Sequence, residues 1–318
     1  MNKIYTGHAL DILKTFPDKS INMCVTSPPY WCLRDYKTQP VTWSDGWNGE
    51  LGAEPDFKQY INHLCDVFDE VKRVLKDDGT CWVNMGDTYG GSSLGLSYAG
   101  KTKGKNSFLK TTEYLPSVAH SRGKNAKSLL LIPFRFAIEM MNRGWTVRNV
   151  IIWQKPNATP ASVKDRFTVD FEYLFFFSKN KKYYFEQQLE PFTESTIKRC
   201  KTGCGLNKGA NYRGLNKENF EKLQQRILDG TTKAKNKRTV WQIATTNFHG
   251  AHFATYPPKL IETPIKAGCP EGGIVLDPFI GSGTTAVVAE KLNRNWVGIE
   301  LNPEYTKLAE ERIANAGT

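Results

Sequence analysis

The sequence predicts an α/β protein in which helices cover a mostly parallel sheet. Two observations lead to this fold class. Strand-like and helix-like segments alternate along both ends of the 318-residue chain, and a glycine-rich loop near residue 280 joins an apolar strand to a helix. Alternation of this kind is typical of βαβ units, whose strands run parallel because each connecting helix packs back on the sheet.

The predicted elements of the N-terminal half begin this alternation. A β-rich run over residues 21–26 stops at two prolines, which end a strand because they lack an amide donor. Apolar residues recur at helical spacing between residues 58 and 75, and Asp77-Asp78-Gly79 is expected to break this helix. In chain order we expect helix 11–16, strand 21–26, helix 58–75, strand 80–85, helix 132–142, strand 146–153 and strand 173–177.

The C-terminal part continues the same pattern. Asn302 is placed to cap the last helix and Pro303 to occupy its first position, where a missing amide donor costs little. A lone amphipathic helix is expected over residues 216–228, inside a basic region that interrupts the alternation and so indicates an insertion. The remaining elements are strand 274–276, a helix that ends at residue 292, and strand 296–299.

The positive charge is concentrated in two segments. The formal net charge is +11, of which residues 88–127 carry +6 and residues 191–240 carry +8, so the rest of the chain carries −3. Both segments are rich in Gly, Asn, Ser and Thr, and aromatic residues are scattered among them. A single run of this kind is more often a solvated loop. Two such runs in one chain favour a surface that binds a nucleic acid.

The composition excludes several classes of protein. Hydrophobic residues make up 40% and charged residues 24%, which is ordinary globular composition. No apolar run approaches the roughly 18 residues that a membrane span needs, and the first residues lack the apolar core of a signal peptide. The seven cysteines are scattered and odd in number, which is typical of reduced thiols. We therefore expect a cytoplasmic protein with no membrane partner.

The residues predict no metal site. Cys200 and Cys204 have no nearby histidine or second cysteine pair to complete four ligands. His249 and His252 are too few on their own.

Three glycine-containing segments compete for a nucleotide-binding role. Gly95-x4-Gly100-Lys101-Thr102 matches a phosphate loop, but no strand leads directly into it and poor helix formers follow it. The segment 86–91 ends a predicted strand and is equally a structural turn or a loop that lines a crevice. The segment 277–285 fits best, because it follows a strand and opens a helix. Its glycines let a ligand approach the backbone.

The acidic residue Glu300 supports this choice. It ends the next predicted strand, 19 residues after Gly281, where a carboxylate accepts hydrogen bonds from ribose hydroxyls. A dinucleotide enzyme needs several further βα units after this point, but only 18 residues follow Glu300. The N-terminal half must therefore complete the sheet, as in a circularly permuted arrangement.

The segment Thr26-Ser27-Pro28-Pro29-Tyr30 points to the chemistry. It follows directly on a strand, and its prolines hold the backbone extended. A flat heterocycle with an exocyclic amine can stack on Tyr30 while the amine donates to Ser27 and to the Pro28 carbonyl. Alone, this string is more often a plain turn, but together with the glycine loop it is highly specific.

With these two segments, the sequence resembles the amino-methylating DNA methyltransferases of the permuted β group. In that family a (Ser/Asn/Asp)-Pro-Pro-aromatic motif precedes a Phe-x-Gly-x-Gly motif, and the resemblance covers nearly the whole chain outside the two basic segments. It implies a Rossmann-like S-adenosylmethionine-dependent methyltransferase fold, circularly permuted, with an inserted target-recognition region. Residues 1–190 would form the catalytic part with a basic loop at about 88–127, residues 191–240 the target-recognition region, and residues 241–318 the cofactor-binding part.

The resemblance also assigns site residues. The catalytic residues are Ser27, Pro28, Pro29 and Tyr30. The residues that bind S-adenosyl-L-methionine are Asp277, Phe279, Gly281, Ser282, Gly283, Thr284 and Glu300, with His252, Tyr256 and Pro257 of a motif at the start of a helix. One departure is Gly7-His8, where relatives commonly carry Gly-Asp. The basic region supplies the DNA-binding candidates, Lys198, Arg199, Lys201, Lys208, Arg213, Lys233, Lys235, Lys237 and Arg238.

The implied reaction is direct methyl transfer to an amine. The target base leaves the duplex and stacks on Tyr30, and hydrogen bonds to Ser27 and Pro28 keep the amine lone pair out of the ring. Positioning then supplies much of the acceleration. A carbon-5 cytosine methylase would need a nucleophilic thiol, usually in a Pro-Cys pair, and none of the 16 prolines precedes a cysteine.

The residues leave some alternatives open. In this family Ser-Pro-Pro-Tyr usually accompanies cytosine N4 methylation and Asp-Pro-Pro-Tyr adenine N6 methylation. We therefore expect N4-methylcytosine in double-stranded DNA, with adenine N6 as the alternative. A DNA-binding relative without turnover is the alternative from another class, and RNA or protein-glutamine methylation is a weaker one. Asp11, Asp87 and Glu172 are either structural caps or crevice residues.

The resemblance also suggests partners and a location. The partners are a second copy of the chain, in a homodimer, and a cognate restriction endonuclease. The location is the nucleoid of a bacterial cell, with the gene carried by the bacterium or by a phage.

Overall fold

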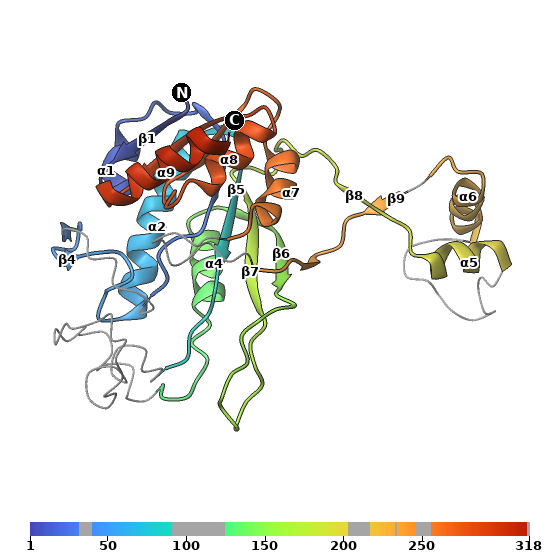
Figure 1. Ribbon diagram of the computed structural model, residues 1–318, viewed down its shortest axis with the longest axis horizontal. Coiled ribbons are helices and arrows are strands. Elements are labelled where there is room, and N and C mark those ends of the chain that lie inside the picture. The colour runs from blue at the N-terminus through green and yellow to red at the C-terminus, as the bar shows by residue number, and fades with distance from the viewer. Residues whose placement is uncertain (32–39, 91–124, 203–216, 233, 246–255, 317–318) are drawn as a thin grey trace. The chain divides into compact units, whose positions relative to one another are not determined.

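The computed structural model describes residues 1–31, 40–90, 125–202, 217–232, 234–245 and 256–316 (Figure 1). The chain divides into two compact units, a larger one of residues 1–186 and 239–318 and a smaller one of residues 187–238. The phosphate-loop match at Gly95–Thr102 and most of the basic segment 88–127 lie outside the described residues. None of the described helices is long and apolar enough to cross a membrane.

A mixed eight-stranded sheet forms the centre of the larger unit. Its strands are β1 (Lys3–Thr6), β2 (Ile21–Thr26), β5 (Leu75–Met85), β6 (Thr146–Gln154), β7 (Phe171–Ser178), β10 (Val240–Gln242), β11 (Ile274–Asp277) and β12 (Asn295–Glu300). Their order in the sheet is β1-β12-β11-β2-β5-β7-β6-β10. Strand β7 runs antiparallel to both of its neighbours, and every other pair is parallel. The prediction of a mostly parallel sheet is confirmed.

Strands from the two ends of the sequence meet in the middle of this sheet. Val275 of β11 pairs with Met23 of β2. The glycine loop therefore leaves β11 beside the point where the Ser-Pro-Pro-Tyr segment leaves β2. A hydrogen bond of 2.6 Å from Thr26 Oγ1 to Asp277 Oδ1 joins the two strand ends.

Helices cover both faces of the sheet and create two cores. The helices of the larger unit are α1 (Ala9–Lys14), α2 (Phe57–Val74), α4 (Ile132–Asn142), α7 (Pro258–Gly268), α8 (Thr284–Lys291) and α9 (Pro303–Ala316). The first three share one core, where Phe68 and Phe136 are fully buried. The last three share the core on the other face, which includes Leu260 and Val288. Side chains that alternate along each strand supply both cores.

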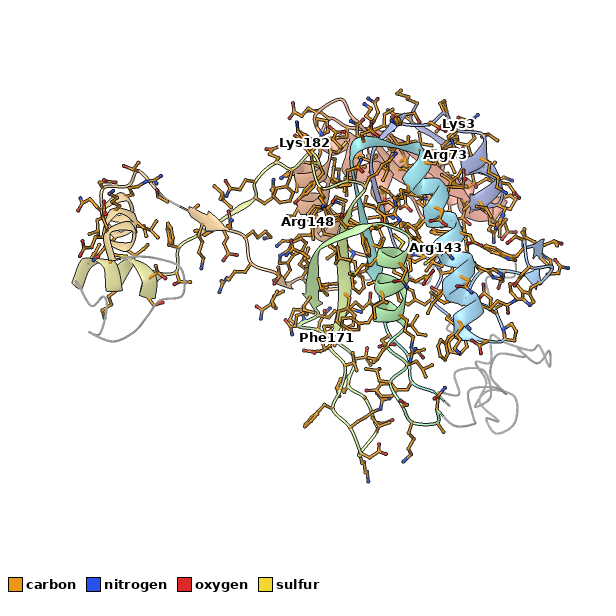
Figure 2. The ribbon with its side chains drawn as sticks, turned by 180° about the vertical axis from the view of Figure 1, so that it is seen from behind. Lys3, Arg73, Arg143, Arg148, Phe171 and Lys182 are labelled. Atoms are coloured by element: carbon orange, nitrogen blue, oxygen red, sulfur yellow. The ribbon has the colours of Figure 1, made fainter. Side chains whose placement is uncertain are left out.

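Charged residues join two helices of the first face. Arg143, directly after α4, lies 2.7 Å from Asp66 and 2.6 Å from Asp69 of α2, and 3.0 Å from Glu139 of α4 (Figure 2). One guanidinium thereby fixes α2 against α4, under the part of the sheet that carries β5 and β7.

Most predicted elements of the larger unit are confirmed, but some bounds differ and some short strands were not predicted. The first helix begins at Ala9 and ends at Lys14, two residues earlier than expected. Asp77-Asp78-Gly79 was expected to end the helix before a strand at 80–85, but the helix already ends at Val74 and the strand begins at Leu75. The three residues therefore lie inside β5 and bulge there, since Ile21 pairs with Leu75 and Met23 pairs with Thr80. Strands β1 and β10 were not predicted, because runs of four and three residues are too short to show a period.

Two short two-stranded sheets complete the described structure. Strands β3 (Val41–Thr42) and β4 (Asn48–Gly49) form a hairpin in the larger unit. The smaller unit contains β8 (Leu189–Pro191) paired with β9 (Ala234–Asn236), and helices α5 (Glu194–Thr202) and α6 (Lys217–Leu228). The predicted helix 216–228 is confirmed as α6, whereas α5 was not expected.

Candidate active site

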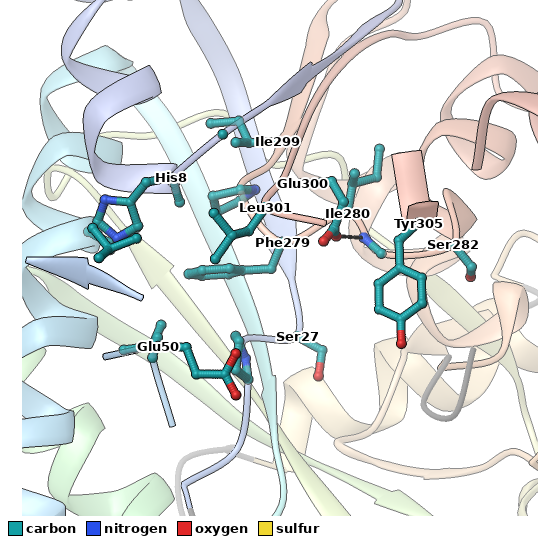
Figure 3. Close-up of a pocket in the computed structure, with 18 of the residues that line it drawn as sticks. His8, Ser27, Glu50, Phe279, Ile280, Ser282, Ile299, Glu300, Leu301 and Tyr305 are labelled. Carbon is teal, nitrogen blue, oxygen red and sulfur yellow. Dashed lines mark hydrogen bonds between the residues drawn. The ribbon is translucent and has the colours of Figure 1, made fainter. Parts of the chain in front are cut away.

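A pocket opens where β1, β2, β11 and β12 end. Parallel strands end at one edge of a sheet, so the loops that follow them face a common crevice. His8 follows β1, Ser27 follows β2, Gly281 follows β11 and Glu300 ends β12, and all four line the pocket (Figure 3). The β3–β4 hairpin and the start of α9 provide the remaining walls, with Trp43, Glu50, Leu51 and Tyr305.

The glycine loop, residues 281–284, is held by the carboxylate of Glu300. The Gly281 amide donates to Glu300 Oε2 at 3.0 Å (Figure 3). The Asn302 amide donates to Glu300 Oε1 at 2.9 Å. Burial raises the pKa of Glu300 to about 7, although the two amides act in the opposite direction and the Asp277 charge adds to the rise. Each oxygen keeps a lone pair for a further donor in the pocket.

The left-handed turn at Gly283 lets this loop pass into α8. Gly283 has φ +80° and is the N-cap of α8. A side chain is strained in this conformation, and an added Cβ would lie 3.2 Å from Ala309 and Ile313 of α9. Glycine here therefore lets α8 and α9 pack closely behind the loop.

Asp277 anchors the floor beneath this pocket. Its buried carboxylate accepts four hydrogen bonds, from the hydroxyls of Thr26 at 2.6 Å, Thr285 at 2.5 Å and Tyr256 at 3.1 Å, and from the Phe279 amide at 3.1 Å. Burial raises the pKa of Asp277, against these donors. Both oxygens of Asp277 thus accept from protein donors that join β2, β11, α8 and the segment before α7, and its predicted contact with the cofactor stays a prediction.

Arg312 of α9 supports the loop from behind. Its Nη1 donates to the Ser282 carbonyl at 3.1 Å, to Ser282 Oγ at 2.8 Å and to Thr284 Oγ1 at 2.9 Å. Sequence reasoning missed this residue. Its position on the last helix gives no local signal, because the contact joins residues about 30 apart.

An aromatic cluster forms the wall on the hairpin side. The His63 ring stacks on Trp43 at 4.3 Å between ring centroids and on Trp47 at 5.5 Å. Its Nδ1 lies 3.1 Å from the buried Glu54 and its Nε2 lies 3.1 Å from Asp45. Burial alone lowers the pKa of His63, but the two carboxylates outweigh it and the net pKa is raised. The cluster fixes Trp43 in the pocket wall.

His8 lies against the same wall. It meets Trp43 edge to face at 4.8 Å, and burial lowers its pKa despite the neighbouring Asp11. Asp11 is the exposed partner of His8, at 3.3 Å. The residue that departs from the family pattern thus occupies the pocket.

A polar cluster surrounds the Tyr30 hydroxyl beside the pocket. Ser27 Oγ donates to it at 3.3 Å and Asn84 Nδ2 at 2.7 Å, while the hydroxyl donates to Glu172 Oε2 at 2.8 Å. Lys155 Nζ lies 2.5 Å from Glu172 Oε1. Burial and then the Glu172 charge raise the pKa of Tyr30 well above its usual value. This cluster assigns Glu172 to the crevice, a choice that the sequence left open.

Gly86 and Asp87 lie on the other side of Tyr30. A Cβ on Gly86 would lie 2.9 Å from Tyr30 Cε2, so only glycine allows the ring its position. Asp87 Oδ1 accepts from the Thr88 amide at 2.8 Å and from the Ile132 amide at 3.0 Å, which caps the start of α4. A second, small cavity is lined by Tyr30, Trp31, Tyr60, Met85, Gly86, Asp87, Thr88 and Ile132.

The predicted site residues fall into three groups. The structure brings to the pocket Ser27, Pro29, Tyr256, Phe279, Gly281, Ser282, Thr284 and Glu300. Next to it lie Tyr30 at the second cavity, the buried Pro28, Asp277 and Gly283, and Pro257 at the N-cap of α7. His252 lies outside the described residues. Among the pocket residues that sequence reasoning missed are Trp43, Glu50, Leu51 and Tyr305.

The predicted DNA-binding residues belong to the smaller unit. Lys198, Arg199 and Lys201 are part of α5, and Lys235, Lys237 and Arg238 lie in or directly after β9. Lys208, Arg213 and Lys233 fall outside the described residues. Glu190 of β8 pairs with Lys235 at 3.4 Å and with Arg238 at 2.6 Å, so these two cations also hold the β8–β9 pair together.

Comparison with known proteins gives one consistent result. The profile of the family N6_N4_Mtase, described as DNA methylase, matches residues 21–311. The type II methyltransferase M.SmaI of Serratia marcescens is 39% identical over 312 residues, which cover 98% of this chain and 90% of M.SmaI.

Solved structures share the fold. The PvuII DNA methyltransferase, described as cytosine-N4-specific, superposes with a TM-score of 0.59 at 19% identity and covers 99% of this chain and 90% of its own. The Thermus thermophilus protein TTHA0409, solved in complex with S-adenosyl-L-methionine, gives a TM-score of 0.57 at 23% identity and covers 99% of this chain and 94% of its own.

Proposed function

Because the chain belongs to the N6_N4_Mtase family of DNA methylases, we propose that it methylates cytosine N4 in a specific sequence of double-stranded DNA, with S-adenosyl-L-methionine as methyl donor. Membership in the family makes the protein a DNA amino-methyltransferase. Ser27 carries the choice of base, since it is neutral and a neutral hydroxyl stands where the adenine enzymes of the resembling family usually have an aspartate.

The pocket residues fit S-adenosyl-L-methionine. Glu300 keeps acceptor capacity in a partly buried place, which suits a pair of ribose hydroxyls. Phe279 and Ile280 offer apolar contact for an adenine ring, and the Tyr256 ring faces the same space. When bound, the cofactor supplies an electrophilic methyl group on a sulfonium.

The chain's own residues then prepare the amine. Tyr30 gives the flipped base a ring to stack on, and Ser27 and the Pro28 carbonyl accept hydrogen bonds from its amine. These bonds hold the nitrogen lone pair out of the ring and toward the methyl group. The nitrogen–carbon bond forms as the sulfur–carbon bond breaks with its electron pair left on sulfur, and the nitrogen releases one proton to solvent.

We assign target recognition to the smaller unit. Its α5 and the end of β9 present the lysines and arginines predicted to contact phosphates. The permuted order of the β group is supported by the neighbouring positions of β2 and β11, since the strand before the catalytic motif comes early in the sequence and the strand before the glycine loop comes late.

The inferred partners follow from the relatives. A cognate restriction endonuclease is expected because M.SmaI is a type II methyltransferase. A homodimer stays a prediction, which sedimentation of the purified protein tests.

Nucleoside mass spectrometry tests the proposal. Unmethylated duplex DNA is incubated with the protein and S-adenosyl-L-methionine and then digested to nucleosides. N4-methylcytosine is expected with the wild type and not with Ser27→Ala, which should still bind the cofactor. Detection of N6-methyladenine would show that the target is adenine and not cytosine. Methylation of RNA or protein but not of DNA would refute the proposal.

A further inference from the structure

Side chains from three segments of the chain contact the hydroxyl of Tyr30, and a side chain from a fourth segment lies behind them. Ser27 comes from the loop after β2, Asn84 from β5 and Glu172 from the start of β7. Lys155, directly after β6, lies 2.5 Å from the far oxygen of Glu172. The chemistry of the proposed function uses Ser27 and the Tyr30 ring. It leaves unexplained why an ion pair lies behind them.

The hydrogen-bond roles in this cluster are fixed by the acidic residue. A carboxylate only accepts, so the Tyr30 hydroxyl must donate its single proton to Glu172 Oε2 at 2.8 Å. Asn84 Nδ2 also donates to Glu172 Oε2, at 2.7 Å, which sets the orientation of that amide, and it donates to the Tyr30 oxygen at 2.7 Å. The tyrosine oxygen then has one lone pair left, and that lone pair can only accept.

Ser27 must therefore donate its proton to Tyr30. The two oxygens lie 3.3 Å apart. A serine hydroxyl has one proton and two lone pairs, so a serine whose proton is already used presents only lone pairs to anything else. The target amine is a donor, and lone pairs are what it needs. An aspartate would accept without help, but a serine accepts reliably only if its proton is directed elsewhere.

We propose that Glu172, held by Lys155, is a positioning residue that acts through Tyr30 to turn the Ser27 hydroxyl into an obligatory acceptor for the target amine. The inference rests on the proposed function. Lys155 fixes the carboxylate by the ion pair, and its own ammonium lies 4.6 Å from the centre of the Trp153 ring. The contacts thus run from Trp153 to the Lys155–Glu172 ion pair, then to the Tyr30 hydroxyl, and from there to Ser27.

A double-mutant cycle tests this arrangement. Glu172→Gln alone should lower kcat for methyl transfer about 10- to 100-fold, the strength of a hydrogen bond to a charged group. The KM for DNA and the affinity for S-adenosyl-L-methionine should stay near wild type. Because Glu172 acts only through the tyrosine hydroxyl, Glu172→Gln should have little further effect in the Tyr30→Phe background. Phenylalanine is one of the aromatic residues that the family motif accepts, so this background keeps a measurable rate.

A second pair of variants separates this role from stability. Glu172→Gln leaves Lys155 without its ion-pair partner, whereas Lys155→Met with Glu172→Gln removes both charges. The double variant should recover thermal stability but not kcat. Glu262→Gln, an exposed carboxylate on α7, is the matched control and should change neither.

Three outcomes would overturn the inference. They are a wild-type kcat in Glu172→Gln, an equal loss of kcat in the Tyr30 and Tyr30→Phe backgrounds, or full recovery of kcat in the double variant. Absence of any methyl transfer to DNA by the wild type would instead refute the proposed function on which the inference rests.

Discussion

Binding of S-adenosyl-L-methionine should depend on pH through Glu300. The pKa of this carboxyl is raised from an ordinary value of 4.5 to about 7, chiefly because burial disfavours its charge. Only the ionised form can accept hydrogen bonds at both oxygens from ribose hydroxyls while it also accepts from the Gly281 and Asn302 amides. Lowering the pH through 7 should therefore weaken cofactor binding.

The size of the effect follows from the ionised fraction. With a pKa of about 7, about nine tenths of the carboxyls are ionised at pH 8 and about one tenth at pH 6. Because the apparent Kd rises as the competent fraction falls, cofactor binding should be about tenfold weaker at pH 6 than at pH 8.

Calorimetric titration across this range measures the effect. Glu300→Gln should bind more weakly throughout and should lose the pH dependence that belongs to the carboxyl, while any titration of the ligand itself remains in both proteins. Glu304→Gln, an exposed carboxylate at the start of α9, is the matched control and should follow the wild type. Parallel pH curves for the wild type and Glu300→Gln would refute the assignment of Glu300.

The stability of the folded protein without cofactor should change with pH in the opposite direction to cofactor binding. A carboxyl whose pKa is higher in the folded state binds protons more tightly there than in the unfolded chain, so its contribution falls as pH rises from about 4.5 to about 7. Without cofactor, Glu300→Gln should therefore lose less thermal stability than the wild type between pH 5 and pH 8. Asp277, whose pKa is raised in the same direction, is present in both proteins, so the difference between them reports Glu300 together with its coupling to Asp277.

Three further changes test other parts of the molecule. Arg312→Met removes the donor behind the glycine loop and should raise the Kd for S-adenosyl-L-methionine about 10- to 100-fold, with kcat at saturating cofactor near wild type; a large fall in kcat would contradict a purely supporting role. Gly86→Ala places a methyl group against Tyr30 and should lower kcat about 10- to 100-fold while cofactor titrations stay unchanged. Lys201→Gln should reduce the slope of log affinity for DNA against log salt by about 0.9, and Lys307→Gln on α9 should leave that slope alone.

The parts of the site that could be predicted from the sequence are those that follow single strands. Ser27 stands directly after a strand, and Gly281 stands between a strand and a helix. Their roles could be predicted because each belongs to a short motif of consecutive residues. Their closeness also follows from general principle, since the ends of parallel strands share one edge of the sheet. The structure confirms that both segments reach one pocket.

Contacts that join distant segments could not be predicted in the same way. Arg312 holds the glycine loop from a helix whose pattern looks like any amphipathic surface helix. The stacking of His63 on Trp43 needs α2 to lie against a two-stranded hairpin that is too short to show a period. Asp277 was expected to touch the cofactor because it begins the loop motif. Its burial beneath the loop depends on donors from three other segments.

The cluster at Tyr30 shows why strand direction matters for function. Glu172 belongs to the first residues of β7, and in a parallel strand those residues would lie at the edge away from the catalytic motif. Strand β7 is inserted antiparallel between β5 and β6, so its first residues lie at the edge where β2 and β5 end. The same reversal brings Glu172 beside Lys155, which follows the end of β6. Sequence periodicity gives no strand direction, so the acid that we propose directs Ser27 becomes visible only once the sheet is assembled.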